Sequence, residues 1–310
     1  MPAFSIVIPC RNAAATLPRT LRSVWEQTCT DWEVLAIDDG SDDATSRLLA
    51  EAEALDPRIR ALTGAGRGPG AARNLGAAQA RGLALAFLDA DDVWAPGRLT
   101  AAAETFAARP DAAAVFARVG FFATDPGRIE ARSALWRRDP GAADLLRANP
   151  ACTASNLVVA RAAFEAAGGF REDLRHAEDV ELMLRLLPHG ALVPQAELLT
   201  FYRASAGGLS SDLERMMAGW RECVRAARSI GHRPSARALR AAEASQLRYL
   251  SRRALRLSQG RGAALGFAWR GLRASPAGFF SAPRQGAATL AAALLRAVAP
   301  ARVGRALADL

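Results

Sequence analysis

Three carboxylates within four positions, Asp89, Asp91 and Asp92, are the residues of this chain best placed to do chemistry. They follow the apolar run 83–88, whose length is typical of a strand buried on both faces of a sheet. Like charges this close repel unless a cation shares them, and Mg²⁺ or Mn²⁺ takes carboxylate oxygens together with substrate phosphates. The cluster therefore predicts a metal–diphosphate site. The same residues also suit a solvated turn in which Asp91 or Asp92 caps the next helix, and the run by itself favours neither reading.

Two further polar clusters stand directly after predicted strands. They are Pro9, Arg11 and Asn12 at the end of the strand 4–9, and Asp38 and Asp39 after the strand 32–37. In open α/β sheets, ligands bind outside the carboxyl ends of the strands. We therefore expect the three clusters to meet on one rim of a sheet.

Strands and helices alternate along the first two thirds of the chain, which predicts an α/β fold with a mostly parallel sheet flanked by helices. The predicted strands are 4–9, 32–37, 59–62, 83–88, 112–122, 156–159 and 198–202. The predicted helices are 17–25, 43–54, 71–81, 96–108, 161–167 and 180–187. Glycines make residues 64–70 a loop, and residues 123–150 are predicted to be irregular.

Charge divides the chain into two predicted domains, 1–210 and 211–310. The formal net charge is +9, yet residues 211–310 hold 18 arginines against 5 acidic residues, so the first domain is mildly acidic. Four separated cysteines without a C-x-x-C pair argue against a zinc site and a disulfide framework and fit a reducing cytosol. The amino-terminal residues lack the pattern of a signal peptide, and no apolar run is long enough to span a membrane.

Taken in order, these motifs resemble the inverting family-2 glycosyltransferases, which have the GT-A (nucleotide-diphospho-sugar transferase) fold. The matching stretches are 5–9 with Asn12, 32–33, 38–43, 70–76, 89–92, 168–170, 178–179 and 202–203. The resemblance covers about residues 3–210, and the order of the motifs carries it, since no single motif is specific. Each motif alone has a plainer explanation, such as a turn at 38–41 or a favourable helix start at 178–179.

The resemblance implies a role for each matching residue. On the donor side, Pro9 and Arg11 would flank the nucleotide base, and Asp39 with Asp38 would hold the base or ribose. Arg73 would make a polar contact to the nucleotide, Asp91 would bind the metal on the diphosphate, and Asp89 would contact the sugar or ribose. On the acceptor side, Asp179 would be the catalytic base and Glu178 its neighbour in the acceptor pocket. Ser205 stands where the family often has a histidine, so a water or Ser205 itself would fill that place.

These roles imply a glycosyltransferase that uses Mg²⁺ or Mn²⁺ and a nucleotide-sugar donor, expected to be a UDP-sugar. The acceptor would be a hydroxyl of a glycan or lipid-linked acceptor in cell-surface polysaccharide or glycolipid synthesis. Two alternatives stay open. One is a catalytically inactive sugar-nucleotide or membrane-binding module, and the other is a nucleotidyltransferase on a similar sheet, which would not need Asp179.

The basic region 211–310 is predicted to be all helical, with helices at 212–229, 235–258, 262–273, 287–298 and 301–307. Basic amphipathic helices can lie on anionic membranes, and Trp269, Phe279 and Phe280 would insert at the interface. This would place a cytoplasmic protein on the inner face of the cell membrane. The alternative is a helical cap with a solvated basic face. Nucleic acid is not an expected partner, because no recognition motif accompanies the charge.

Overall fold

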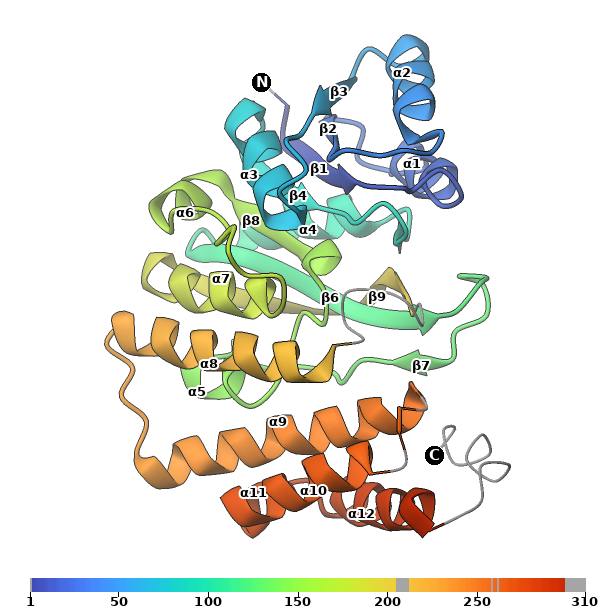
Figure 1. Cartoon of the computed structure of the whole chain (residues 1–310). Helices are drawn as coiled ribbons and strands as arrows, with labels where there is room; N and C mark the ends of the chain where they lie inside the picture. The colour runs from blue at the N-terminus through green and yellow to red at the C-terminus, as the bar shows by residue number, and fades with distance from the viewer. Residues whose placement is uncertain (1, 205–211, 258, 261, 299–310) are drawn as a thin grey trace. The chain divides into compact units, whose positions relative to one another are not determined.

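The computed structural model describes residues 2–204, 212–257, 259–260 and 262–298. The chain divides into two compact units, one made of Met1–Gly141 with Asn149–Ser205 and the other of Ala142–Ala148 with Ala206–Leu310 (Figure 1). The short segment Ala142–Ala148 thus belongs to the second unit although both of its neighbours in the chain belong to the first. The assignment of residues 1–210 and 211–310 as functional domains stays a prediction.

The first unit contains both strands and helices. Its strands are β1 (Phe4–Cys10), β2 (Trp32–Asp38), β3 (Ile59–Thr63), β4 (Ala84–Phe87), β5 (Val93–Trp94), β6 (Ala112–Phe122), β7 (Ala131–Arg132), β8 (Leu157–Ala160) and β9 (Ala191–Arg203). Its α-helices are α1 (Leu17–Trp25), α2 (Thr45–Leu55), α3 (Pro69–Gln79), α4 (Arg98–Ala108), α6 (Arg161–Ala166) and α7 (Glu178–Leu186), with short 3-10 turns at Ala154–Asn156 and Leu187–His189.

Within the described residues the strands form one sheet in the order β3-β2-β1-β4-β8-β6-β9-β5, with β7 beside β6. The pairs β2–β3, β1–β2 and β1–β4 are parallel, as the strand–helix alternation predicts. Beyond β4 the sheet is mixed, because β8 runs antiparallel to both β4 and β6 while β6 and β9 are parallel.

Helices cover both faces of the parallel part, and alternating residues of β1 show which helix lies where. Ile6 and Ile8 belong to the same buried cluster as apolar residues of α1, α2 and α4. Val7 points to the other face, where a Cβ atom on Gly76 of α3 would come within 2.5 Å of its side chain. The small residue therefore lets α3 pack closely on the sheet (Figure 1).

The carboxyl ends of β1, β2 and β4 lie side by side at one edge of the sheet. Cys10, the last residue of β1, is in register with Asp38, and the amide of Asp39 donates to the carbonyl of Cys10 over 2.8 Å. Leu88, which follows β4, donates through its amide to the carbonyl of Val7 over 3.1 Å. The predicted rim of polar clusters therefore exists.

Two elements differ from the sequence predictions. The last strand, β9, begins at Ala191 and not at residue 198, because its first half runs beside β6 despite carrying Pro194, Gln195 and exposed Glu197. The stretch 123–150 is not wholly irregular, since it contains β7 and the helix α5 (Ala142–Leu145).

The second unit is helical: α5 is followed by α8 (Leu213–Ser229), α9 (Ala236–Arg256), α10 (Ala263–Ala274), α11 (Pro276–Phe279) and α12 (Pro283–Val298). Helix α9 packs against α10, α11 and α12, and its residues Leu247, Leu250 and Ala254 are buried. The predicted helix 301–307 lies outside the described residues. No helix among those described is both long and apolar enough to cross a membrane.

Substitution of Gly82 tests how tightly the parallel sheet is packed at the start of β4. It is buried between α3 and β4, its amide donates to Ser5 Oγ over 2.8 Å, and an added Cβ would lie 2.5 Å from the backbone nitrogen of Ser5. We expect Gly82→Ala to lower the free energy of unfolding by about 1–3 kcal/mol, because backbone cannot move aside as a side chain can. Urea denaturation measures the change.

Gly141→Ala is the matched control, since a Cβ there meets nothing within 4 Å and the backbone needs no positive φ. It should be neutral or slightly stabilising, by less than about 1 kcal/mol. Equal free energies of unfolding for the two variants would contradict the packing described for Gly82.

Candidate active site

Arg73 links residues from three elements. It lies on α3, its side chain is 3% exposed, and it makes two ion pairs, Nη2 to Asp89 Oδ1 at 2.5 Å and Nη1 to Glu178 Oε1 at 3.2 Å. Burial alone would lower the pKa of Arg73, but the charges and hydrogen bonds of the two carboxylates outweigh burial and raise it. Arg73 therefore stays charged and joins the end of β4 to the start of α7.

Asp179 lies in the first turn of α7 and is 7% exposed. Its Oδ1 accepts from the amide of Val180 at 2.8 Å, and its Oδ2 accepts from Asn149 Nδ2 at 2.6 Å. Burial, followed by the charge of Glu178, raises the pKa of Asp179 to about 6. Such a carboxylate is ionised at neutral pH and is a stronger base than an ordinary aspartate, which suits it to accept a proton. Asn149 has no counterpart in the sequence analysis, because it lies in the stretch predicted to be irregular.

The carboxylates after β4 occupy different environments. Asp92 is fully buried, its Oδ1 accepts from the amide of Arg203 at 2.8 Å, and its Oδ2 has no hydrogen-bond partner in the described part of the chain. Burial, followed by the charges of Asp91 and Asp89, raises the pKa of Asp92 well above its ordinary value. Asp92 therefore ties β9 to the turn. The solvated-turn alternative does not describe it, and the N-cap of α4 is Gly97 without a side-chain cap.

Asp91 is half-buried, and burial, followed by the charge of Asp89, raises its pKa to about 6. Among the described residues, no group of three or more acidic, histidine or cysteine side chains could enclose a metal ion. The residues therefore do not fit a closed protein site. They do fit a cation that takes one carboxylate from Asp91 and completes its coordination with phosphate oxygens, because such a cation would relieve the repulsion between Asp89 and Asp91.

Asp39 holds the glycine-rich loop at the neighbouring strand end. Its Oδ1 accepts from the amides of Gly66 and Arg67 at 2.8 and 3.2 Å, and its Oδ2 accepts from the amide of Gly68 at 2.7 Å. A Cβ atom on Gly64 would come within 2.6 Å of Oδ1, so this approach requires glycine. Asp39, Gly64 and Arg67 line a cavity of about 340 Å³. These loop contacts of Asp39 were not predicted.

Asp38 precedes Asp39 at the end of β2, and Pro9 and Arg11 lie at the adjacent end of β1. Asp38 Oδ1 accepts from the amide of Ser41 at 3.0 Å and Oδ2 accepts from the hydroxyl of Ser46. Burial would raise the pKa of Asp38, but these hydrogen bonds outweigh it and lower the pKa. Pro9 is half-buried in β1, and Arg11 is exposed.

Asn74 ties α3 to the segment before α7. Its Oδ1 accepts from the amide of Phe170 at 2.8 Å, and its Nδ2 donates to the carbonyl of Phe170 at 2.8 Å and to Glu172 Oε1 at 3.1 Å. Glu172 also pairs with Arg67 of the glycine-rich loop at 2.7 Å. The segment 168–172 is therefore held to both α3 and the loop. The motif 70–76 pointed to Asn74 only as a family position and gave it no role.

The structure thus brings Arg73, Asp89, Glu178 and Asp179 into one connected group. Pro9, Arg11, Asp38 and Asp39 stand at the adjacent ends of β1 and β2, and Asp91 lies two residues beyond Asp89. Ser205 lies outside the described residues, so its predicted place beside the metal stays a prediction.

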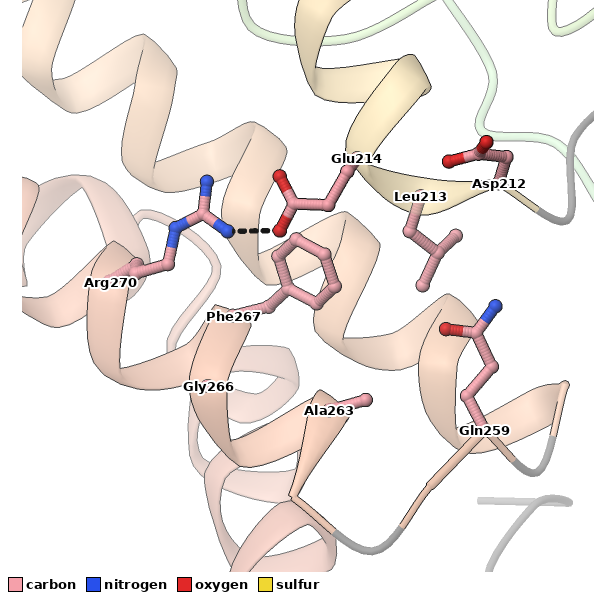
Figure 2. A pocket seen from close by; sticks show the side chains of 8 residues that line it. All are labelled: Asp212, Leu213, Glu214, Gln259, Ala263, Gly266, Phe267 and Arg270. Carbon is pink, nitrogen blue, oxygen red and sulfur yellow. Dashed lines mark hydrogen bonds and ion pairs between the residues drawn. The ribbon is translucent and has the colours of Figure 1, made fainter.

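A larger cavity, of about 520 Å³, lies wholly within the second unit. Figure 2 shows Glu214 and Arg270 pointing toward each other beside the ring of Phe267, and their ion pair measures 2.5 Å. None of the predicted site residues lines this cavity. Its size alone does not make it the site of the chemistry.

Comparison with solved structures establishes the fold. TarS 1–349 of S. aureus in complex with UDP-GlcNAc matches with a TM-score of 0.66 and 17% sequence identity, over 99% of this chain and 88% of that one. The mannosyltransferase PcManGT of Pyrobaculum calidifontis, in complex with GDP-Man and Mn²⁺, matches with a TM-score of 0.62 and 19% identity, over 99% of this chain and 83% of that one. The first unit has the GT-A fold, as the sequence predicted.

Curated relatives are similar in sequence over part of their length. O-antigen biosynthesis protein RfbC of Myxococcus xanthus is 37% identical over 191 residues, which are 60% of this chain and 14% of that protein. UDP-Glc:alpha-D-GlcNAc-diphosphoundecaprenol beta-1,3-glucosyltransferase WfgD of Escherichia coli is 40% identical over 96 residues, which are 31% of this chain and 37% of that protein. The matched stretch therefore spans much less than two thirds of either relative. The sequence model of Glycosyl transferase family 2 matches residues 5–167, more than half of the chain, and the chain belongs to this family.

Proposed function

We propose that this chain is an inverting glycosyltransferase that moves a sugar from a nucleotide-sugar to a hydroxyl group of a glycan or lipid-linked acceptor. Membership in the family and the GT-A fold support a reaction of this class. The observation that carries the proposal is the buried carboxylate of Asp179, whose neighbour Glu178 is joined through Arg73 to Asp89. The guanidinium of Arg73 thereby links Asp89 to the first turn of α7, which carries Asp179.

Asp179 acts as the general base. It takes the proton of the acceptor hydroxyl while that oxygen attacks the anomeric carbon from the face opposite the leaving nucleotide. A single displacement of this kind inverts the anomeric configuration. Burial, followed by the charge of Glu178, raises the pKa of Asp179 to about 6, so the base is ready at neutral pH and lost in acid. Glu178 lines the acceptor pocket and keeps Arg73 in place.

Asp91 is the residue that would hold Mg²⁺ or Mn²⁺. When bound, such a cation would act as a Lewis acid and offset the negative charge of the leaving nucleoside diphosphate. Asp89, fixed by Arg73, contacts the sugar or the ribose. Arg73 thus reaches the nucleotide indirectly, since both of its carboxylate contacts are to protein.

The cavity beside Asp39 takes the nucleotide base, with Pro9 and Arg11 flanking it and Asp38 on the ribose side. An ionised carboxylate offers about four lone-pair sites, and backbone amides of the glycine-rich loop fill three of those on Asp39. The one remaining site matches the single N–H of uracil or thymine better than the two parallel N–H groups of guanine. The hydrogen bonds of Asp39 therefore favour a UDP-sugar or dTDP-sugar over a GDP-sugar.

The acceptor and the place of action are inferred from the relatives and from the second unit. The names of RfbC and WfgD refer to O-antigen synthesis and to a diphosphoundecaprenol acceptor, which supports a role in cell-surface glycan synthesis on a lipid-linked acceptor. Such an acceptor lies in a membrane. We therefore infer that the protein works at the cytoplasmic face and contacts anionic lipid through its second unit.

Helices α10 and α12 carry the apolar residues for that contact. Trp269 is 60% exposed, and Leu294, Leu295 and Val298 are 48%, 51% and 80% exposed at helical spacing on one side of α12. Phe279 was expected to insert as well, but it is fully buried, because Gly271 leaves room for its ring. Arginines surround these residues in the sequence, and basic side chains add attraction to anionic headgroups.

Replacing the base tests the reaction. Asp179→Asn should lower the release of nucleoside diphosphate by at least about 10²-fold, because the amide cannot accept the proton. Thermal stabilisation by the nucleotide should persist, since Asp179 is assigned to the acceptor side. In the unchanged protein, the rate should fall as the pH drops below about 6, where Asp179 becomes protonated.

Asp173→Asn is the matched control, because Asp173 is exposed and pairs only locally with Arg171. Its rate should stay within about twofold of the unchanged protein. Full activity of Asp179→Asn would sink the assignment of the base and favour a nucleotidyltransferase reaction.

Thermal unfolding with UDP, dTDP and GDP, each with Mn²⁺ and each with EDTA, tests the donor site. A nucleotide at about 100 times its Kd should add roughly 2.7 kcal/mol of stability. We expect UDP or dTDP to stabilise more than GDP, and EDTA or Asp91→Asn to remove the effect. Asp125→Asn, at an exposed turn, should retain it. Stabilisation that is indifferent to EDTA would refute the metal assignment, and none at all would refute the nucleotide site.

Flotation with vesicles tests the membrane contact. The full chain should float with phosphatidylcholine vesicles that contain phosphatidylglycerol. It should not float with vesicles made of phosphatidylcholine alone. Changing Leu294, Leu295 and Val298 together to serine should abolish flotation. Leu55→Ser, which removes a 74% exposed leucine from the first unit, should not. If the triple variant floats like the unchanged protein, α12 is not the contact.

A further inference from the structure

We propose that Asn149 is the positioning residue of Asp179: its carboxamide holds one oxygen of the carboxylate and fixes the plane in which the other lone pairs face the acceptor. This inference rests on the proposed function, because it takes Asp179 as the base. It adds a residue that neither the motifs nor the comparisons single out. Asn149 is the first residue of the second segment of the first unit, and Asp179 lies 30 residues further along the chain.

The orientation of the Asn149 side chain is set by the backbone around it. Its Oδ1 accepts from the amides of Ala151 and Cys152 at 3.1 and 3.0 Å. Because these amides require an acceptor, the oxygen of the carboxamide must face them, and the NH₂ group must face Asp179. The distance of 2.6 Å between Nδ2 and Asp179 Oδ2 is that of a short, charge-assisted hydrogen bond.

The turn that carries these amides is itself constrained. Cys152 has a positive φ of 68°, which is uncommon for a residue other than glycine. The buried Thr153 that follows accepts from the amide of Ser155 through its hydroxyl at 3.2 Å. Asn149 thus stands in a turn whose backbone is held on both sides, and the turn presents a donor to Asp179.

Asp179 is then held by one donor on each oxygen, the Asn149 carboxamide on Oδ2 and the amide of Val180 on Oδ1. Each oxygen keeps a second lone pair for the acceptor hydroxyl. The charged groups near Asp179 are Glu178, which raises its pKa, and Arg73, which lowers it. The thiol of Cys152 is neutral, since burial and then the charge of Asp179 raise its pKa to about 12. Asn149 therefore supplies a neutral donor that opposes protonation of the base.

Asn149→Asp separates positioning from a structural role in the turn. The new carboxylate can still accept from the two backbone amides, so the turn persists, but it no longer donates to Asp179. Two carboxyl groups in contact must share a proton or repel. We expect the pair to titrate with its upper apparent pKa at least about one unit above that of Asp179 in the unchanged protein. Carbon-13 NMR of the aspartate carboxyl groups measures this, with Asp179→Asn used to assign the signal.

Turnover gives the second readout. With Mn²⁺ and a panel of UDP-glucose, UDP-N-acetylglucosamine and GDP-mannose, the acid limb of the rate profile should move up by about one unit in Asn149→Asp. At pH 6.5 kcat should fall at least about fivefold, and KM for the nucleotide-sugar should stay within about twofold. Gln285→Glu is the matched control, because it makes the same change from amide to carboxylate at an exposed position of the second unit. The pKa of Asp179 and the rate profile should stay unchanged in this variant.

The two readouts distinguish the two proposals. An unchanged titration of Asp179 in Asn149→Asp would overturn the positioning role, whatever the turnover. If the wild-type protein releases nucleoside diphosphate from none of the three donors, that result would instead count against the proposed function. The titration would still decide the role of Asn149.

Discussion

A guanidinium buried in a protein interior needs negative charge close to it, because the interior solvates a charge less well than water does. Arg73 meets this need with Asp89 and Glu178, which lie 16 and 105 residues away along the chain. The end of β4, the helix α3 and the start of α7 must therefore meet at one point. Removing the guanidinium would leave two partly buried carboxylates uncompensated, so this ion-pair group fixes how the three elements meet.

Burial raises the pKa of Asp91, Asp92 and Asp179, yet the three carboxylates are not equivalent. Asp92 accepts a hydrogen bond from the amide of Arg203 and so anchors the end of β9. The hydrogen bond from Asn149 and the charge of Arg73 act against the raised pKa of Asp179, the proposed base. The charge of Asp89 raises the pKa of Asp91, and that of Arg203 acts against it. A raised pKa therefore marks a buried carboxylate, while its neighbours decide whether it is structural, catalytic or metal-binding.

The sequence was most informative where apolar runs end in polar residues. Mostly apolar runs located β1, β2 and β4, and the direction of parallel strands then placed Asp38, Asp39 and Asp89 on one rim. It was least informative where partners are distant in the chain or a strand lacks an apolar pattern. Pro194 and Glu197 hid the first half of β9, and nothing in residues 123–150 signals that Asn149 meets Asp179. The exposed fraction of Phe279 depends on space left by Gly271, which periodicity does not show.

The glycine-rich loop and the segment before α7 are parts of one hydrogen-bonded arrangement. Asp39 accepts hydrogen bonds from backbone amides of the loop, and Arg67 of the loop pairs with Glu172. Asn74 of α3 donates hydrogen bonds to Phe170 and Glu172. If Asp39 binds a nucleobase as proposed, that base would contact a residue already tied to the segment before α7. Ala177, immediately before α7, has a positive φ of 60°, a conformation that alanine holds only when its surroundings impose it. This residue immediately precedes the helix that carries Asp179, the proposed base.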